Sequence, residues 1–276
     1  MRYIKENEPL KSFIIILLLS LATISFSQEM KLVFKDSILG KYSHFSVDNF
    51  GRVYLCRNDV ILQFSNQYDT LFSTSLKQLT PSSLESSKSF RTLVFDQERS
   101  VVHFLDNTLT DIHGQIDLVS LDLQQPILVC ESFAGNTFWV LDAGSMRLVK
   151  LNENLEKVIQ TENLVTLFDA DDLPNQMLES NDFLFVSIPG KGVGVFDVFG
   201  TYIRFIEMDC ERIDVLNNYL LVKAENIVQA IPTETFFVTD VRYELPSDVI
   251  DFRFANSKVY VLREKGLFIG EYEIKE

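Results

Sequence analysis

The feature that most constrains this chain is a repeat of about 40 residues. Short apolar runs of strand length begin at Val53, Leu93, Phe138, Phe183, Leu220 and Val259, between 37 and 45 residues apart. A lone meander of short strands cannot bury both of its faces, so each copy needs neighbours like itself. Repeats of this length are typical of rings in which each copy forms one blade.

A second landmark keeps step with the first. In each of the first five copies, an apolar residue followed by a polar turn comes 11 to 13 residues after the start of the run. These turns are rich in Asn, Asp, Gly, Ser and Pro, which tolerate or pre-set turn dihedrals. Each copy therefore predicts four short antiparallel strands. The first strands are expected at residues 43–47, 82–85, 127–130, 176–179, 212–215 and 249–252.

The two ends of the chain complement each other. The sixth copy shows only three strands, the last over residues 267–274, while a lone strand at 31–35 precedes the first copy. Pairing these two segments removes both free edges. The sequence thus predicts an all-β, six-bladed β-propeller of four-stranded antiparallel blades, closed by the N-terminal strand.

Residues 1–27 have the pattern of a signal peptide. Arg2, Lys5 and Lys11 supply positive charge, residues 13–24 are almost uniformly apolar, and Ser25-Phe26-Ser27 offers small residues before a cleavage point. The apolar run is shorter than the roughly 20 residues of a membrane span. We expect export to the periplasm or the cell exterior, with residues 28–276 forming one domain. An uncleaved membrane anchor is the alternative, and the only route to a membrane.

The charge balance limits the partners. Loss of residues 1–27 would change the net charge from −14 to −15. Nucleic acids and anionic membranes bind clustered Lys and Arg, so nucleic acid is excluded as a partner class. Cationic ligands, metal ions and basic protein surfaces suit such a chain, although acidity also serves solubility alone.

Cysteine and histidine provide no recognisable catalytic group. Cys56, Cys130 and Cys210 are an odd, widely spaced set in apolar segments, which favours buried thiols over a disulfide framework. The three histidines, His44, His103 and His113, fall in different strand or turn positions and are not expected to converge on one site.

The chain resembles the NHL-like and YncE-like six-bladed propellers of exported bacterial proteins. The resemblance covers residues 28–276 and rests on two turns, Asp48-Asn49-Phe50-Gly51 before Val53-Tyr54-Leu55, and Asp197-Val198-Phe199-Gly200. It implies a platform for binding, with enzymes as a minority of the class.

Carboxylates recur in or beside the predicted first strands, which line the channel of a propeller. Several carboxylates facing one axis would bind a hard cation such as calcium, or a cationic ligand. Solvated turn positions are the alternative, and no other cofactor is expected. The candidate residues are Asp48, Glu85, Glu131, Glu179, Asp214 and Asp251.

Aromatic residues also lie outside the expected core strands. Gathered at one mouth of the channel, they would indicate peptide or sugar binding, whereas packing between blades is the alternative. These residues are Tyr42, Tyr68, Phe90, Phe133, Phe199, Tyr202 and Tyr243.

Together these features predict an exported, non-catalytic binding or scaffold propeller that engages a protein, peptide or envelope glycan through one face. The alternative is a metal-dependent hydrolase or lactonase-like enzyme with a cation in the channel. A membrane-tethered assembly factor is a third hypothesis, if the N-terminal segment is retained.

Overall fold

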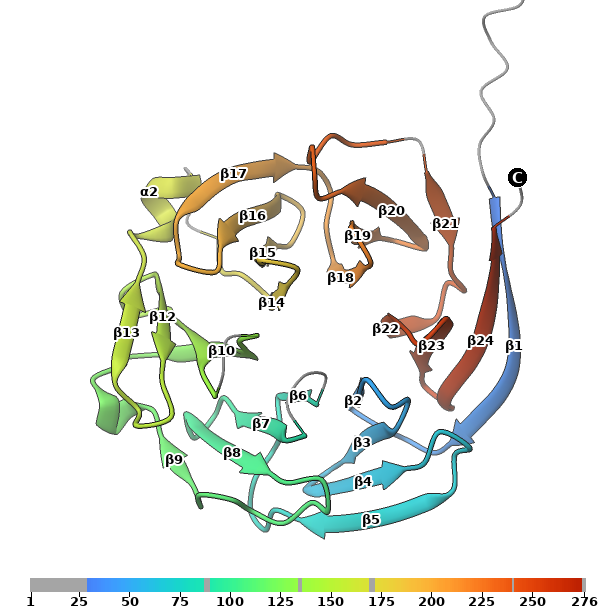
Figure 1. Cartoon of the computed structure of the whole chain (residues 1–276), viewed down its shortest axis with the longest axis horizontal. Coiled ribbons are helices and arrows are strands. Elements are labelled where there is room, and N and C mark those ends of the chain that lie inside the picture. Colours follow the sequence, from blue (N-terminus) through green and yellow to red (C-terminus); the bar gives the residue numbers. More distant parts are fainter. Residues whose placement is uncertain (1–28, 87–89, 134–135, 169–171, 240, 275–276) are drawn as a thin grey trace, which may run out of the picture.

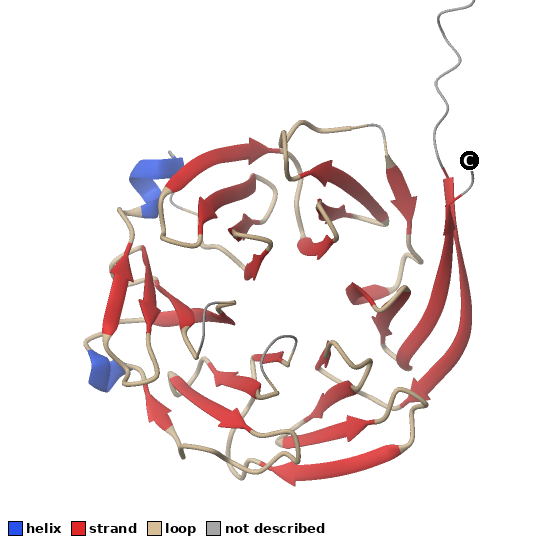
Figure 2. Ribbon diagram, viewed as in Figure 1, coloured by secondary structure: helices blue, strands red, loops and turns tan. Residues whose placement is uncertain are grey.

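The fold is a ring of six antiparallel blades (Figure 1). The computed structural model describes residues 29–86, 90–133, 136–168, 172–239 and 241–274. The predicted signal peptide therefore lies outside the described residues. Apart from the 3-10 helix η1 (Val119–Leu121) and the short helix α2 (Leu164–Phe168), the described elements are strands (Figure 2). None of the described helices is long and apolar enough to cross a membrane.

Each of the first five blades is built from four consecutive strands, the innermost first. Blade 1 contains β2 (His44–Val47), β3 (Val53–Arg57), β4 (Val60–Phe64) and β5 (Thr70–Ser75). Blade 2 contains β6 (Ser83–Glu85), β7 (Thr92–Asp96), β8 (Val101–Leu105) and β9 (Ile116–Asp117). Blade 3 contains β10 (Pro126–Glu131), β11 (Phe138–Asp142), β12 (Arg147–Leu151) and β13 (Lys157–Gln160). Blades 4 and 5 contain β14 (Gln176–Ser180), β15 (Phe183–Ile188), β16 (Gly192–Asp197) and β17 (Tyr202–Glu207); and β18 (Arg212–Leu216), β19 (Tyr219–Ala224), β20 (Ile227–Pro232) and β21 (Arg242–Glu244).

Blade 6 confirms the predicted closure of the ring. It is formed by β22 (Val249–Ala255), β23 (Lys258–Arg263), β24 (Gly266–Ile274) and, outermost, β1 (Glu29–Leu39). The first residues of β1 pair antiparallel with the end of β24, from Met30 opposite Ile274 to Phe34 opposite Gly270. β1 is longer than expected because the pairing continues after a bulge, up to Leu39 opposite Gly266. Two residues of β1 also pair in parallel with β21, which joins blades 5 and 6 in one sheet.

The core lies between the blades. The six clusters of buried apolar residues each join two neighbouring blades. On β11, Phe138 and Val140 pack toward blade 2, whereas Trp139 and Leu141 pack toward blade 4. Both sides of such a strand are buried, which explains why the sequence shows unbroken apolar runs instead of alternation. Burial of each large side chain contributes about 1.5–3 kcal/mol.

The predicted state of the three cysteines is confirmed: all are buried thiols. Cys210 is fully buried, and burial together with the charges of Asp209 and Glu211 raises its pKa to about 12. We therefore expect the native protein to resist iodoacetamide at pH 8, because the reagent needs an exposed thiolate. Mass spectrometry should find alkylated Cys210 only after unfolding in urea. Alkylation of the native protein at the rate of a free thiol would contradict this burial.

The meander gives the ring two distinct faces. The loops after the first and third strands of each blade share one side, which we call the front face. The loops after the second strands and the connections between blades share the other side, the back face. The innermost strands run from back to front, so the predicted channel residues divide according to their position along these strands.

Candidate functional site

The central channel holds five of the six predicted carboxylates. A cavity of about 280 Å³ at the front is lined by Asp48, Glu85, Glu179 and Asp214. A smaller cavity of about 120 Å³ at the back is lined by Asp251 together with His44 and Arg212. The sixth carboxylate lines neither cavity.

Glu179 joins blade 4 to blade 3. Its side chain is fully buried and accepts hydrogen bonds from the Trp139 indole Nε1 (2.6 Å), the Ser132 hydroxyl (2.9 Å) and the Phe133 backbone N–H. The buried Lys150 Nζ lies 3.5 Å from the same carboxylate and 5.0 Å from the centroid of the Trp139 ring. Four groups of blade 3 therefore converge on one carboxylate of blade 4.

Two more carboxylates connect blades 2 and 3. The Glu131 backbone N–H donates to Glu85 Oε2 at 2.8 Å, and Arg91 Nε donates to Glu131 Oε1 at 2.6 Å. Glu131, the carboxylate outside both channel cavities, is 1% exposed. A buried carboxylate needs such donors because an unpaired charge in the interior is costly.

Asp214 links blade 5 to blade 6. It accepts hydrogen bonds from Arg253 Nη1 (3.0 Å) and from the Phe254 backbone N–H (2.7 Å). Burial raises the pKa of Asp214, against the opposing charge of Arg253. Arg253 lines both channel cavities, so the channel carries a cation of its own beside the acidic side chains.

These contacts give the carboxylates structural partners. The described residues contain no group of three or more His, Cys, Asp or Glu side chains arranged to hold a metal ion. The shared cation site and its candidate ligand calcium stay a prediction. The geometry supports a structural role for four of the carboxylates, which hold neighbouring blades together through hydrogen bonds: Glu85, Glu131, Glu179 and Asp214.

The histidines are distributed as the sequence predicts. His44 lies in β2 at the back of the channel, where burial lowers its pKa against the opposing charge of Asp251. His103 lies in β8 with its Nδ1 2.6 Å from Asp111 Oδ2, and His113 lies in the loop between β8 and β9. Among the described residues, no histidine is placed with a nucleophile and an acid as in a catalytic triad.

The predicted aromatic residues fall into two groups. Phe90, Phe133 and Phe199 are exposed in front-face loops. The tyrosines of the set pack against the apolar clusters between blades, which is the packing role given above as the alternative to ligand binding: Tyr42, Tyr68, Tyr202 and Tyr243.

Two further exposed phenylalanines were missed by the sequence reasoning. Phe50 and Phe237 also lie in front-face loops, and the exposed fractions of the five are 57% for Phe50, 67% for Phe90, 77% for Phe133, 75% for Phe199 and 69% for Phe237. Among described phenylalanines, the only other exposed one, Phe72, lies on the outer strand β5. We call these five the front-face phenylalanines.

Local turn geometry fixes two of them outward. Asp48 Oδ1 accepts hydrogen bonds from the backbone N–H groups of Phe50 and Arg52, and Gly51 follows with a φ of +77°. In blade 4, Asp197 Oδ1 accepts from Phe199 and Thr201 in the same way, and Gly200 has a φ of +81°. The shared Asp-x-Phe-Gly sequence is the signal that could have identified Phe50, because it places a large apolar side chain at the tip of a polar turn.

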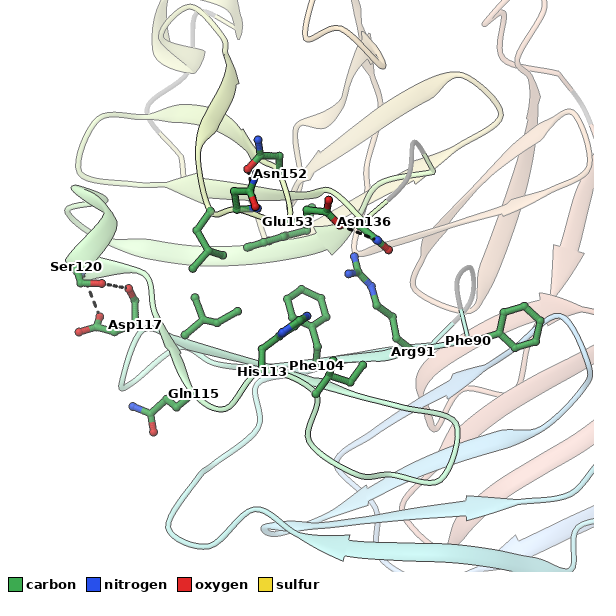
Figure 3. Close-up of a pocket in the computed structure, with 15 residues that line it drawn as sticks. Phe90, Arg91, Phe104, His113, Gln115, Asp117, Ser120, Asn136, Asn152 and Glu153 are labelled. Carbon is green, nitrogen blue, oxygen red and sulfur yellow. Dashed lines mark hydrogen bonds between the residues drawn. The ribbon is translucent and has the colours of Figure 1, made fainter.

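A groove of about 780 Å³ lies between blades 2 and 3 and runs from the front-face loops along the outer side of the ring to Asp117 at the end of β9 (Figure 3). Phe104 of β8 and Phe138 of β11 form its floor, with ring centroids 5.4 Å apart at 68°. Arg91 lies at its edge, with the guanidinium carbon 4.2 Å from the centroid of Phe104. Phe90 also lines the groove and packs against Phe50 of blade 1, with ring centroids 5.3 Å apart and the rings tilted by 42°. The groove is thus continuous with two of the front-face phenylalanines, Phe90 and Phe50.

Comparison with known proteins supports the fold alone. No protein-family model matches the chain, and no curated protein matches its sequence. Among solved structures, virginiamycin B lyase from Staphylococcus aureus is 12% identical with a TM-score of 0.60, over 89% of this chain and 100% of that chain. BamB from Moraxella catarrhalis is 9% identical with a TM-score of 0.52, over 85% and 84%. BBS1N, solved in complex with ARL6DN, is 11% identical with a TM-score of 0.56, over 81% and 75%.

These neighbours include an enzyme, the lyase, and a protein bound to another protein. The same architecture therefore serves both classes, and function has to be argued from the surface of this chain. The finer resemblance to NHL-like and YncE-like propellers stays a prediction, because no family model matches. The solved structures share the β-propeller architecture with this chain.

Proposed function

We propose that this protein is an exported, non-catalytic β-propeller that binds a protein partner through its front face. The observation that carries the proposal is the gathering of five exposed phenylalanines in the loops of that face. Exposed aromatic side chains gathered on one surface are typical of interaction sites, since aromatics dominate the energy of protein interfaces.

The arrangement of these side chains supports a broad contact surface. Phe50, Phe90 and Phe133 come from blades 1 to 3, while Phe199 and Phe237 come from blades 4 and 5. Phe133 lines the front cavity of the channel, and Arg204 lies 5.7 Å from the ring centroid of Phe237. A partner that rests on this face could contact several blades at once, as specific interfaces require.

Export is part of this proposal and is supported by the N-terminal sequence pattern. The mass of the secreted protein tests it, because cleavage would leave Gln28 first, whereas an anchor would be retained. The hydrolase alternative is less well supported, because the front-channel carboxylates Asp48, Glu179 and Asp214 already bind protein donors.

A pair of matched variants tests the binding face. We expect the triple variant Phe50→Ser, Phe133→Ser, Phe199→Ser to lose at least about 100-fold in partner affinity, because large aromatic anchors contribute about 2 kcal/mol or more each. The control replaces three exposed apolar residues of the back face that lie away from the groove, Leu39→Ser, Val165→Ser and Leu173→Ser. Extracts of the source organism are passed over both proteins and the wild type, and the retained proteins are compared by quantitative mass spectrometry.

The proposal is supported if a protein is retained by the wild type and by the back-face control but not by the front-face variant. The purified partner should then bind the wild type and the control more tightly than it binds the front-face variant. Equal retention by the two variants would overturn the assignment of the front face. Absence of any retained protein would overturn the binding function itself.

A further inference from the structure

We propose that the groove between blades 2 and 3 binds an extended peptide segment of the partner, with an apolar side chain on the groove walls and a Lys or Arg at its acidic rim. This inference rests on the proposed function and specifies the chemistry of the ligand. It is carried by the shape of the groove, its charge and its polar side chains.

The groove results from an unusually short outer strand. β9 comprises only Ile116–Asp117, the shortest outer strand of the six blades. The connection from β8 instead forms a compact loop, in which Asp106 Oδ1 accepts hydrogen bonds from the N–H groups of Thr108 (2.8 Å) and Thr110 (2.9 Å). The Asp111 carboxylate then bonds His103 and the backbone N–H of His113. These bonds hold the wall in place, so the groove is formed before a ligand arrives.

Apolar contacts are available along the groove. Phe90 and Ile112 are exposed at its edges, and Leu155 is half-buried opposite the loop of blade 2. Beneath them, Phe104 and Phe138 are almost fully buried and form a packed floor. One apolar side chain of a peptide would therefore gain contacts on several sides, which is the usual form of an interface anchor.

The charges of the groove select a cation. The one Arg of the lining, Arg91, is paired with Glu131 at 2.6 Å, so the two largely neutralise each other. Asp117 and Glu153 are exposed carboxylates that line the groove from blades 2 and 3 (Figure 3). Their hydrogen-bond donors, the Val119 backbone N–H for Asp117 and the Asn136 amide for Glu153, are neutral groups, so neither carboxylate loses its charge. The whole chain carries a net charge of −14, which adds a long-range attraction for basic segments. An anionic peptide or an anionic lipid surface would meet repulsion here.

The polar rim suits a peptide backbone. Each side-chain amide presents both a donor and an acceptor, and an extended backbone needs both in alternation. Glu153 Oε2 accepts a hydrogen bond from the Asn136 amide at 3.1 Å, which orients that side chain. The Asn152 amide is used within its own turn, because it donates to Glu156 Oε2 at 2.8 Å and accepts from two backbone N–H groups, so it shapes the rim and does not offer a peptide contact. The amide side chains that line the groove are Gln115, Asn136, Asn152 and Asn154.

A random dodecapeptide library displayed on phage tests this inference on the full protein. We expect the selected peptides to share an apolar residue next to Lys or Arg. The double variant Asp117→Asn, Glu153→Gln should weaken the best peptide about tenfold by fluorescence anisotropy, because two charges at a partly desolvated rim are lost. Wild-type affinity should also fall as salt is raised, and the variant should be less sensitive to salt.

The matched control removes two exposed carboxylates from back-face turns, Glu98→Gln and Glu264→Gln, and should leave affinity within twofold. Equal affinity of the two double variants for the peptide, or selected peptides rich in Asp and Glu, would overturn the groove assignment. The proposed function would still be supported if the front-face triple variant lost peptide binding. Failure to select any peptide would count against the groove, and the extract experiment tests the function separately. Co-sedimentation with phosphatidylglycerol vesicles that depends on the front-face phenylalanines would replace the peptide with a membrane.

Discussion

A chain that begins at Gly40, and so lacks β1, is expected to lose its cooperative unfolding transition and to aggregate. Nine residues of β24 pair with β1, and Ile38, Leu32 and Phe34 of β1 pack into the clusters on either side of blade 6. Without β1, the edge of β24 is unpaired, and the blade loses its contact with β21. Circular dichroism during urea titration and static light scattering measure the two effects.

A rearranged chain provides the control for this deletion. Met30 pairs with Ile274, so the start of β1 and the end of β24 lie at the same edge of the ring. Moving residues 29–39 to follow Glu276 through a short Gly-Ser linker would form an ordinary hairpin and keep every strand. We expect this permutant to unfold cooperatively like the wild type. If the deletion variant itself unfolded cooperatively at the wild-type midpoint, closure by β1 would not be required for stability.

Glu179→Ala is expected to lower the free energy of unfolding by about 3–5 kcal/mol, the usual cost of removing one partner from a buried ion pair. The substitution leaves the buried Lys150 ammonium and the Trp139 N–H without their carboxylate. Both groups would then remain desolvated without a countercharge, since Lys150 would keep the neutral Val198 carbonyl at 3.2 Å and the Trp139 ring. Urea unfolding followed by the fluorescence of Trp139, the one tryptophan of the chain, measures the change.

Two variants separate this role from a general effect of lost charge. Glu179→Gln keeps an acceptor for Trp139 but removes the negative charge, so an intermediate loss is expected. Glu153→Ala removes an exposed carboxylate and should change stability by no more than about 0.5 kcal/mol. A Glu179→Ala protein as stable as the wild type would show that the contact between blades 3 and 4 contributes little.

Much of the architecture could be predicted from the sequence because it depends on local patterns. Strand length, turn residues and apolar runs repeat in each blade, and the predicted first strands agree with the observed ones within a few residues at each end. The closure followed from counting strands, since the missing strand and the spare one had to pair. The bulge between Phe34 and Asp36 and the resulting length of β1 have no such local signal.

The surface was predicted less well. Glu179 and Asp214 were identified as channel residues, but the sequence contains no indication that Trp139, Lys150 and Arg253 would reach them from neighbouring blades. Likewise, the sequence did not distinguish the tyrosines from the phenylalanines expected outside the core strands. In the structure the four tyrosines pack against the clusters between blades, whereas Phe90, Phe133 and Phe199 are exposed. Whether a side chain is buried, hydrogen-bonded or exposed depends on how close the neighbouring blade lies to it in space, and the sequence pattern contains no such distance.

The sequence by itself determined the number of blades, their strand order and the way the ring closes, because periodic burial and turn chemistry are properties of neighbouring residues in the chain. Only the tertiary structure decided that the buried carboxylates join blades and that five phenylalanines share one exposed face with an acidic groove. Those features join residues far apart in the sequence, such as Glu179 and Trp139 or Phe50 and Phe90, which are each 40 positions apart. Their meeting is set by how the blades pack around the axis.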